Sequence, residues 1–117
     1  MGLQGALYTG VSALGATGEA MNVIGNNLAN SNTTAFKASR TLFSDLLASD
    51  VSSSSGTSQV GTGVGLASVD TVFSQGGFNP TESSTDLAIE GEGFFKVSDP
   101  NTGADAYTRA GGFNFND

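Results

Sequence analysis

The sequence predicts an α+β fold: a long amino-terminal helix of coiled-coil character, a linker, and then the start of an all-β domain with hairpins. Three observations support this. The first 36 residues contain one charged side chain, Glu19, and carry apolar residues at helical spacing. A later stretch is rich in Ser and Gly, and after it apolar and polar residues alternate. We therefore expect three segments: an assembly helix at 1–32, a connecting arm and flexible linker at 33–65, and the start of a truncated β domain at 66–117.

The amino-terminal helix is expected to bury one face against other helices. From Leu7 to Leu28, a Leu or Met recurs every seven residues, with further apolar residues in neighbouring heptad positions. The predicted assembly surface consists of Leu3, Leu7, Val11, Leu14, Met21, Ile24 and Leu28. Five glycines inside this helix each cost about 1 kcal/mol relative to Ala. We interpret it as a helix that becomes ordered when partners bury it; an ordinary buried helix of a single domain fits the pattern equally well.

Polar residues are expected to end the helix. Asn, Ser and Thr dominate residues 26–34, and their side chains favour caps and turns. Phe36 and Phe43 follow seven residues apart, which predicts a short second helix or an extended arm. The stretch from Asp50 to Gly65 then reads as a flexible linker or surface loop.

Alternating segments in the last third of the chain predict short strands. These are Val69–Phe73, Asp86–Ile89, Gly93–Ser98, Ala106–Arg109 and a further strand beginning at Gly112. A strong turn signal at Asp99–Gly103 predicts that the third and fourth of them form a hairpin. Because the chain stops inside the last alternating segment, we expect it to be part of a longer protein.

Composition excludes several classes of function. The chain has no His and no Cys, so the usual zinc and iron–sulfur ligands and the common nucleophilic residue sets are missing. We expect no catalytic residue, no metal and no cofactor. A net charge of −7, with only four Lys and Arg, argues against nucleic acid. The amino terminus has no basic region typical of a cleaved signal, and no apolar run predicts membrane insertion.

Two motifs suggest chemistry, but neither has the spacing or the surroundings that the chemistry requires. Gly61, Gly63 and Gly65 resemble part of a phosphate-binding loop, yet the fingerprint's third glycine would fall on Leu66 and no Lys follows. Glu90 and Glu92 form a carboxylate pair, but the glycines around them and the absence of a predicted pocket favour solvated charges.

The ordered set of motifs resembles the bacterial flagellar rod and hook protein family. Met21–Asn30 followed by Asn32–Lys37 is similar to its amino-terminal signature, with motif positions at Asn26, Asn27, Asn30, Thr34, Phe36 and Lys37. Later pieces appear in the family's order: Phe43–Leu46, Val60–Val64, Phe73–Gly76, Thr85–Phe95 and Tyr107–Phe113. Ala35 stands where the family most often has Gly.

The resemblance implies a structural role, not an enzyme. Members of the family polymerise into the helical tube of the rod or hook, and their amino-terminal helix pairs with a carboxy-terminal helix of the same chain. Other partners would be the flagellar axial proteins and the type III export apparatus. Gly25 before Asn26 is more typical of hook subunits, which places the chain in the extracellular hook. A distal or proximal rod subunit of the basal body is the alternative. A soluble ligand-binding module is a third hypothesis, from a different class of function.

Overall fold

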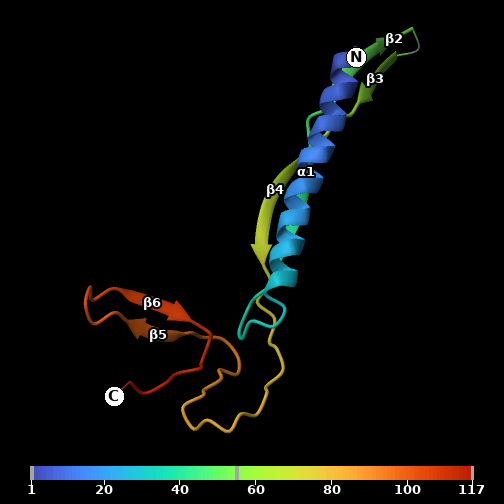
Figure 1. Ribbon diagram of the computed structural model, residues 1–117. Helices are drawn as coiled ribbons and strands as arrows, with labels where there is room; N and C mark the ends of the chain where they lie inside the picture. The colour runs from blue at the N-terminus through green and yellow to red at the C-terminus, as the bar shows by residue number, and fades with distance from the viewer. Residues whose placement is uncertain (1, 55, 117) are drawn as a thin grey trace. The chain divides into compact units, whose positions relative to one another are not determined.

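A computed structural model describes residues 2–54 and 56–116 (Figure 1). Met1, Ser55 and Asp117, which belong to the three predicted segments, lie outside the described residues. The chain forms two compact units. We call Met1–Ala29 with Ala38–Val72 the helical unit, and Asn30–Lys37 with Phe73–Asp117 the hairpin unit.

The predicted amino-terminal helix is confirmed as α1, Leu3–Ala29. Its backbone has no proline to interrupt it, and two threonine hydroxyls bond to carbonyls one turn earlier: Thr9 to Gly5 at 2.9 Å and Thr17 to Ala13 at 2.8 Å. The helix ends where the run of Asn, Ser and Thr begins to form turns. Among the described residues, no helix combines the length and the apolar character that crossing a membrane requires.

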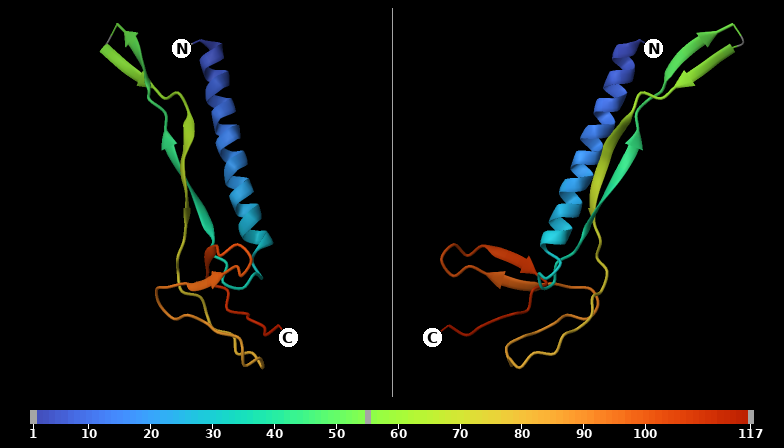
Figure 2. Two further views of the ribbon diagram at one scale, coloured as in Figure 1. Left: turned by 90° about the vertical axis from the view of Figure 1, so that its left-hand side faces the viewer. Right: turned by 45° about the vertical axis from the view of Figure 1, so that its right-hand side comes forward.

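The segment after the helix forms the extended arm, one of its two predicted alternatives. Strand β1, Ser39–Asp45, pairs antiparallel with β4, Val64–Thr71, and the register shifts between Leu42 and Phe43. We call this pair the β1–β4 ribbon. Helix α1 lies alongside it in each view and contacts both strands (Figure 2).

The sequence predicts a flexible linker or surface loop from Asp50 to Gly65 and predicts no strands there, whereas the structure contains two. Most of this stretch forms an antiparallel hairpin of β2, Ser49–Ser53, and β3, Gly56–Val60. Cross-strand bonding explains how so polar a sequence holds an extended form: the Gln59 side-chain amide donates to Asp50 at 2.9 Å. Pairing satisfies the backbone polar groups that face the partner strand, and the exposed outer groups can bond to water.

The predicted hairpin in the last third is confirmed as β5, Phe95–Ser98, paired with β6, Asp105–Thr108. Asp99 organises the turn: its side chain accepts the Asn101 amide at 2.9 Å and the Thr102 hydroxyl at 2.8 Å. Gly103 closes the turn with a φ of 68°, which favours glycine. The Asn101 amide, followed by the Thr102 hydroxyl, lowers the pKa of the Asp99 carboxyl.

Two of the predicted strands are not found among the described residues. The segments beginning at Asp86 and Gly112 meet in a single bridge, and the Leu87 amide donates to the Gly111 carbonyl at 3.0 Å. Gly111 has no room for a side chain, because the Leu87 carbonyl occupies the place where a Cβ would lie. The predicted strand at Val69–Phe73 is confirmed only for Val69–Thr71, because β4 ends at Thr71.

The described residues contain almost no core. Ala16, at 8% exposure, and Gly111 are the buried residues, whereas large apolar side chains on both units are exposed. A chain that leaves so much apolar surface uncovered is typical of a protein that completes its packing with partners.

Candidate assembly surface

One side of α1 faces the β1–β4 ribbon and carries mostly small or polar residues. These covered residues follow one another at spacings of three or four, as one face of a helix requires. They are Gly5, Thr9, Ser12, Ala16, Ala20, Val23 and Asn27. Only one of the seven, Val23, is a large apolar residue, so the helix approaches the ribbon closely without burying its own leucines.

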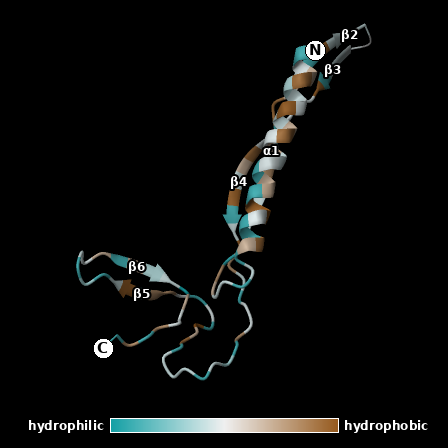
Figure 3. Cartoon of the chain, viewed as in Figure 1, coloured by the Kyte–Doolittle hydropathy of each residue, from teal (hydrophilic) through white to brown (hydrophobic). Residues whose placement is uncertain are grey.

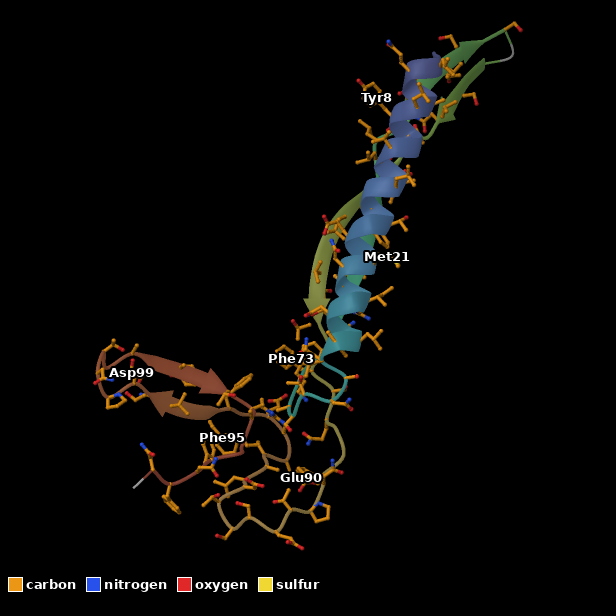
Figure 4. The ribbon with its side chains drawn as sticks, in the orientation of Figure 1. Tyr8, Met21, Phe73, Glu90, Phe95 and Asp99 are labelled. Atoms are coloured by element: carbon orange, nitrogen blue, oxygen red, sulfur yellow. The ribbon has the colours of Figure 1, made fainter. Side chains whose placement is uncertain are left out.

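The predicted assembly surface lies on the other side of α1. All seven of its residues are exposed, by 58% at Ile24 to 79% at Leu3. At about 100° per residue, Leu14 lies roughly 200° around the helix from Ser12, which faces the ribbon. Figure 3 shows apolar residues along the length of α1, and Met21 projects outward from it in Figure 4. We call these seven residues the α1 stripe.

Glycines lie between the larger residues of the α1 stripe. Gly18 and Gly25 alternate with Met21 and Leu28 at spacings of three and four, and nothing lies within 4 Å of where a Cβ of either glycine would be. The exposed side therefore offers projecting side chains next to gaps. This is the relief into which the side chains of a second helix fit when two helices pack knobs into holes.

An open hollow lies at the start of the helix, between the α1 stripe and the covered side. It lies between the first turns of α1 and the end of β3, and it includes the stripe residue Leu3. Its lining is Gly2, Leu3, Ala6, Thr9, Val60 and Gly61.

A close contact ties the first half of α1 to the ribbon. The Ser12 hydroxyl accepts the Val64 amide at 3.3 Å and donates to the Thr9 carbonyl at 2.8 Å. Gly63 has a φ of 124°, and a Cβ there would collide with the Ser12 hydroxyl. Glycine at position 63 therefore lets the backbone come close to α1. This contact accounts for one of the three glycines that resembled a phosphate-binding loop.

A second contact ties the last turns of α1 to the start of β1. The Asn27 side-chain amide donates to the Ser39 carbonyl at 2.7 Å, and its oxygen accepts the Ser39 amide at 2.9 Å. One side chain thereby satisfies both backbone groups of Ser39, as a neighbouring strand would. The sequence marked Asn27 only as a motif residue, and nothing in its local pattern predicted this partner.

Most of the remaining motif residues belong to the hairpin unit. Asn30 accepts the Thr33 amide at 3.0 Å through its carbonyl, and the Lys37 ammonium donates to the Ser74 carbonyl at 2.6 Å. Phe36 is half-buried and Thr34 is exposed, while Asn26 is exposed at the end of α1. Ala35 has a φ of 61°, the left-handed conformation in which glycine is favoured.

Arg109 gathers three separate segments of the hairpin unit. Its guanidinium donates to the carbonyls of Gly91 at 2.8 Å, Gly93 at 2.9 Å and Ile89 at 3.3 Å. It also donates to the Gln75 side-chain oxygen at 3.2 Å, which accepts the Gly91 amide at 3.4 Å. Local sequence patterns do not reveal this role, because each partner lies at least 16 residues away. The one available signal was an arginine close to two glycines, Gly111 and Gly112.

The glutamate pair shows no arrangement for acid–base chemistry. Glu90, labelled in Figure 4, and Glu92 are both exposed. The ion pair found among the described residues joins two others, Lys96 and Asp105, at 2.7 Å on the β5–β6 hairpin.

Comparison with known proteins matches both ends of the chain. The family model described as flagella basal body rod protein matches residues 7–37, and that of the flagellar hook protein FlgE/F/G D1 domain matches residues 88–117. The flagellar hook protein FlgE of Borreliella burgdorferi is 41% identical over 92% of this chain and 26% of its own length. The flagellar basal-body rod protein FlgG of Caulobacter vibrioides is 43% identical over 96% of this chain and 47% of its own length.

A helix with a single charged residue and an exposed apolar stripe, followed by small antiparallel hairpins, is typical of a structural protein that packs against partners. The chain belongs to the flagellar rod and hook protein family. It spans about a quarter of the length of the hook relatives that it matches and less than half of the rod relatives.

Proposed function

We propose that this chain is the amino-terminal part of a structural subunit of the flagellar hook. Such subunits polymerise into the curved tube that couples the basal body to the filament. The observation that carries the proposal is the α1 stripe, a row of exposed apolar side chains without charge on the side of the helix away from the ribbon. It supports assembly because burying one such side chain contributes about 1.5–3 kcal/mol.

The occupant we propose for the α1 stripe is a carboxy-terminal helix of the full-length chain, surrounded by further copies in the tube. An uncharged stripe favours an equally apolar helix over a charged one, since a charge buried there would lack a partner. The division into segments 1–32, 33–65 and 66–117 stays a prediction about the full-length subunit. Other axial proteins would adjoin the tube, and export would use the flagellar type III apparatus.

A rod subunit of the basal body is the second candidate, favoured by the similar identity of the FlgG relatives. The length of the full chain separates the two. A rod subunit would be about twice as long as this segment, since the segment covers 45% of one FlgG relative, whereas it covers 26% of a FlgE relative. In either case the role is mechanical, the location is the bacterial flagellum, and catalysis is not part of it.

The test places a charge on the α1 stripe. Met21→Asp in the full-length subunit would bury an unpaired carboxylate in the packed helix layer, at a cost of several kcal/mol, and should abolish swimming. The matched control is Asn22→Asp at the adjacent position, which is exposed and already polar. Motility equal to wild type in both variants would refute the proposal.

A further inference from the structure

We propose that Asn27 and the Ser12–Gly63 contact are positioning elements that set the rotation of α1 on the β1–β4 ribbon and so aim the α1 stripe at its partner. This inference rests on the proposed assembly function and adds the residues that make the surface usable. It concerns contacts inside the helical unit, which the α1 stripe itself does not touch.

The two contacts hold α1 at well-separated points. Ser12 and Asn27 are 15 residues apart, which corresponds to about 22 Å along a helix. Both lie on the covered side, and they contact opposite ends of the ribbon: the Val64 amide begins β4, and Ser39 begins β1. A single contact would let the helix pivot, whereas two at this distance resist both pivoting and rolling.

Apolar packing cannot do this work on the covered side. Burial of apolar surface is non-directional, and here the buried side chain is only that of Ala16. Hydrogen bonds are directional, with a strong preference for a nearly straight donor–hydrogen–acceptor angle. The polar contacts are therefore the features that distinguish one rotation of α1 from another.

Each positioning element demands its own residue type. Asn27 must offer a donor and an acceptor together to match the carbonyl and the amide of Ser39, which neither Asp nor Leu does. Gly63 must lack a Cβ for Ser12 to come near enough to accept the Val64 amide.

Rotation matters because the α1 stripe begins immediately next to these contacts. Leu28 follows Asn27 directly, so it lies about 100° around the helix from the covered side. A roll of one residue, about 100°, would turn one edge of the α1 stripe into the ribbon and bring the polar covered side towards the partner.

The test compares Asn27→Ala with Asn22→Ala, which makes the same change in the same helix at an exposed position whose side-chain amide donates to Glu19 at 3.5 Å. In Asn27→Ala, hydrogen exchange at the Ser39 amide should rise about tenfold, the loss expected for about 1.4 kcal/mol of bonding. The helical circular dichroism should remain, and motility of cells that carry the variant full-length subunit should fall. Asn22→Ala should match wild type in all three.

Ser12→Ala provides a second measurement at the other end of α1. It removes the acceptor of the Val64 amide while favouring the helix slightly, so Val64 exchange should rise and motility should fall. It decides the matter if Asn27→Ala loses its helical signal. The inference is overturned if exchange is unchanged in both variants, or if exchange rises and motility stays normal. Failure of the assembly function itself would show separately, as normal motility in Met21→Asp.

Discussion

The two units of this chain are both stabilised by a polar side chain that binds backbone, yet they treat their apolar residues differently. In the helical unit, Asn27 binds Ser39, and the large apolar residues of α1 face outward. In the hairpin unit, Arg109 binds three carbonyls. Aromatic rings also pack against one another there: the ring centroids of Phe95 and Phe113 lie 5.2 Å apart, edge to face.

The difference suggests a division of roles. Edge-to-face ring pairs contribute about 0.5–1.5 kcal/mol beyond their burial, so the hairpin unit uses part of its apolar content for its own stability. The helical unit keeps its apolar content for a partner and relies on hydrogen bonds for its internal contacts. Three substitutions and a change of pH test this division of roles.

Gly63→Ala should destabilise the helical unit most. A Cβ at this position meets the Ser12 hydroxyl and sits on a φ of 124°, so we expect a loss of about 2–4 kcal/mol from strain and displacement of α1. Gly61→Ala is the control, because nothing lies within 4 Å of its Cβ. Urea unfolding followed by helical circular dichroism measures both. Equal midpoints would show that α1 does not depend on this contact.

Arg109→Lys should loosen the hairpin unit while leaving α1 intact. A lysine ammonium keeps the charge but lacks the planar fork that reaches four acceptors, so the cost should be about 1–2 kcal/mol. Exchange of the Gly91 amide reports the effect. Arg40→Lys, at an exposed residue on β1, is the control. A lysine that fully replaces Arg109 would mean that charge alone, not geometry, stabilises this unit.

Ala35→Gly should stabilise the hairpin unit slightly. The left-handed conformation at φ 61° costs a non-glycine residue about 1–2 kcal/mol. Glycine relieves this strain but loses more chain entropy on folding, which offsets about half of the gain. The net gain should be below about 1 kcal/mol in thermal unfolding. Ala38→Gly, where φ is not positive, should instead lose stability. A loss in both would contradict the assigned turn geometry.

Acid should weaken the Asp99 turn before it affects α1. The folded-state pKa of Asp99 is lowered, chiefly by the Asn101 amide, so its stabilising effect is fully present above the ordinary value of 3.8. It is lost as pH falls through the lower folded pKa, because protonation removes the charged acceptor. The Asn101 amide shift followed by NMR should titrate in that range, and Asp99→Asn should abolish the titration. A titration midpoint at or above pH 3.8 would show that these hydrogen bonds do not stabilise the charged form of Asp99.

Much of the fold could be predicted from the sequence, because it depends on near neighbours. Helix α1 follows from heptad spacing and the lack of proline, and the β5–β6 hairpin follows from alternation around the Asp99–Gly103 turn. The position of the α1 stripe is equally local, since the angle between residues of one helix depends only on their spacing. That the helix becomes ordered only when partners bury it stays a prediction.

The tertiary structure decided what joins distant parts of each unit. Asn27 meets Ser39 across 12 residues, Ser12 meets Val64 across 52, and Arg109 reaches Gln75 across 34. It also placed Gly63 against Ser12, where a side chain would not fit. Periodicity reports which residues share a face, but it does not say which distant backbone that face meets. Residue spacing therefore specifies the helix and its apolar side, whereas the packing of α1 on the β1–β4 ribbon specifies which side is covered and which is left for a partner.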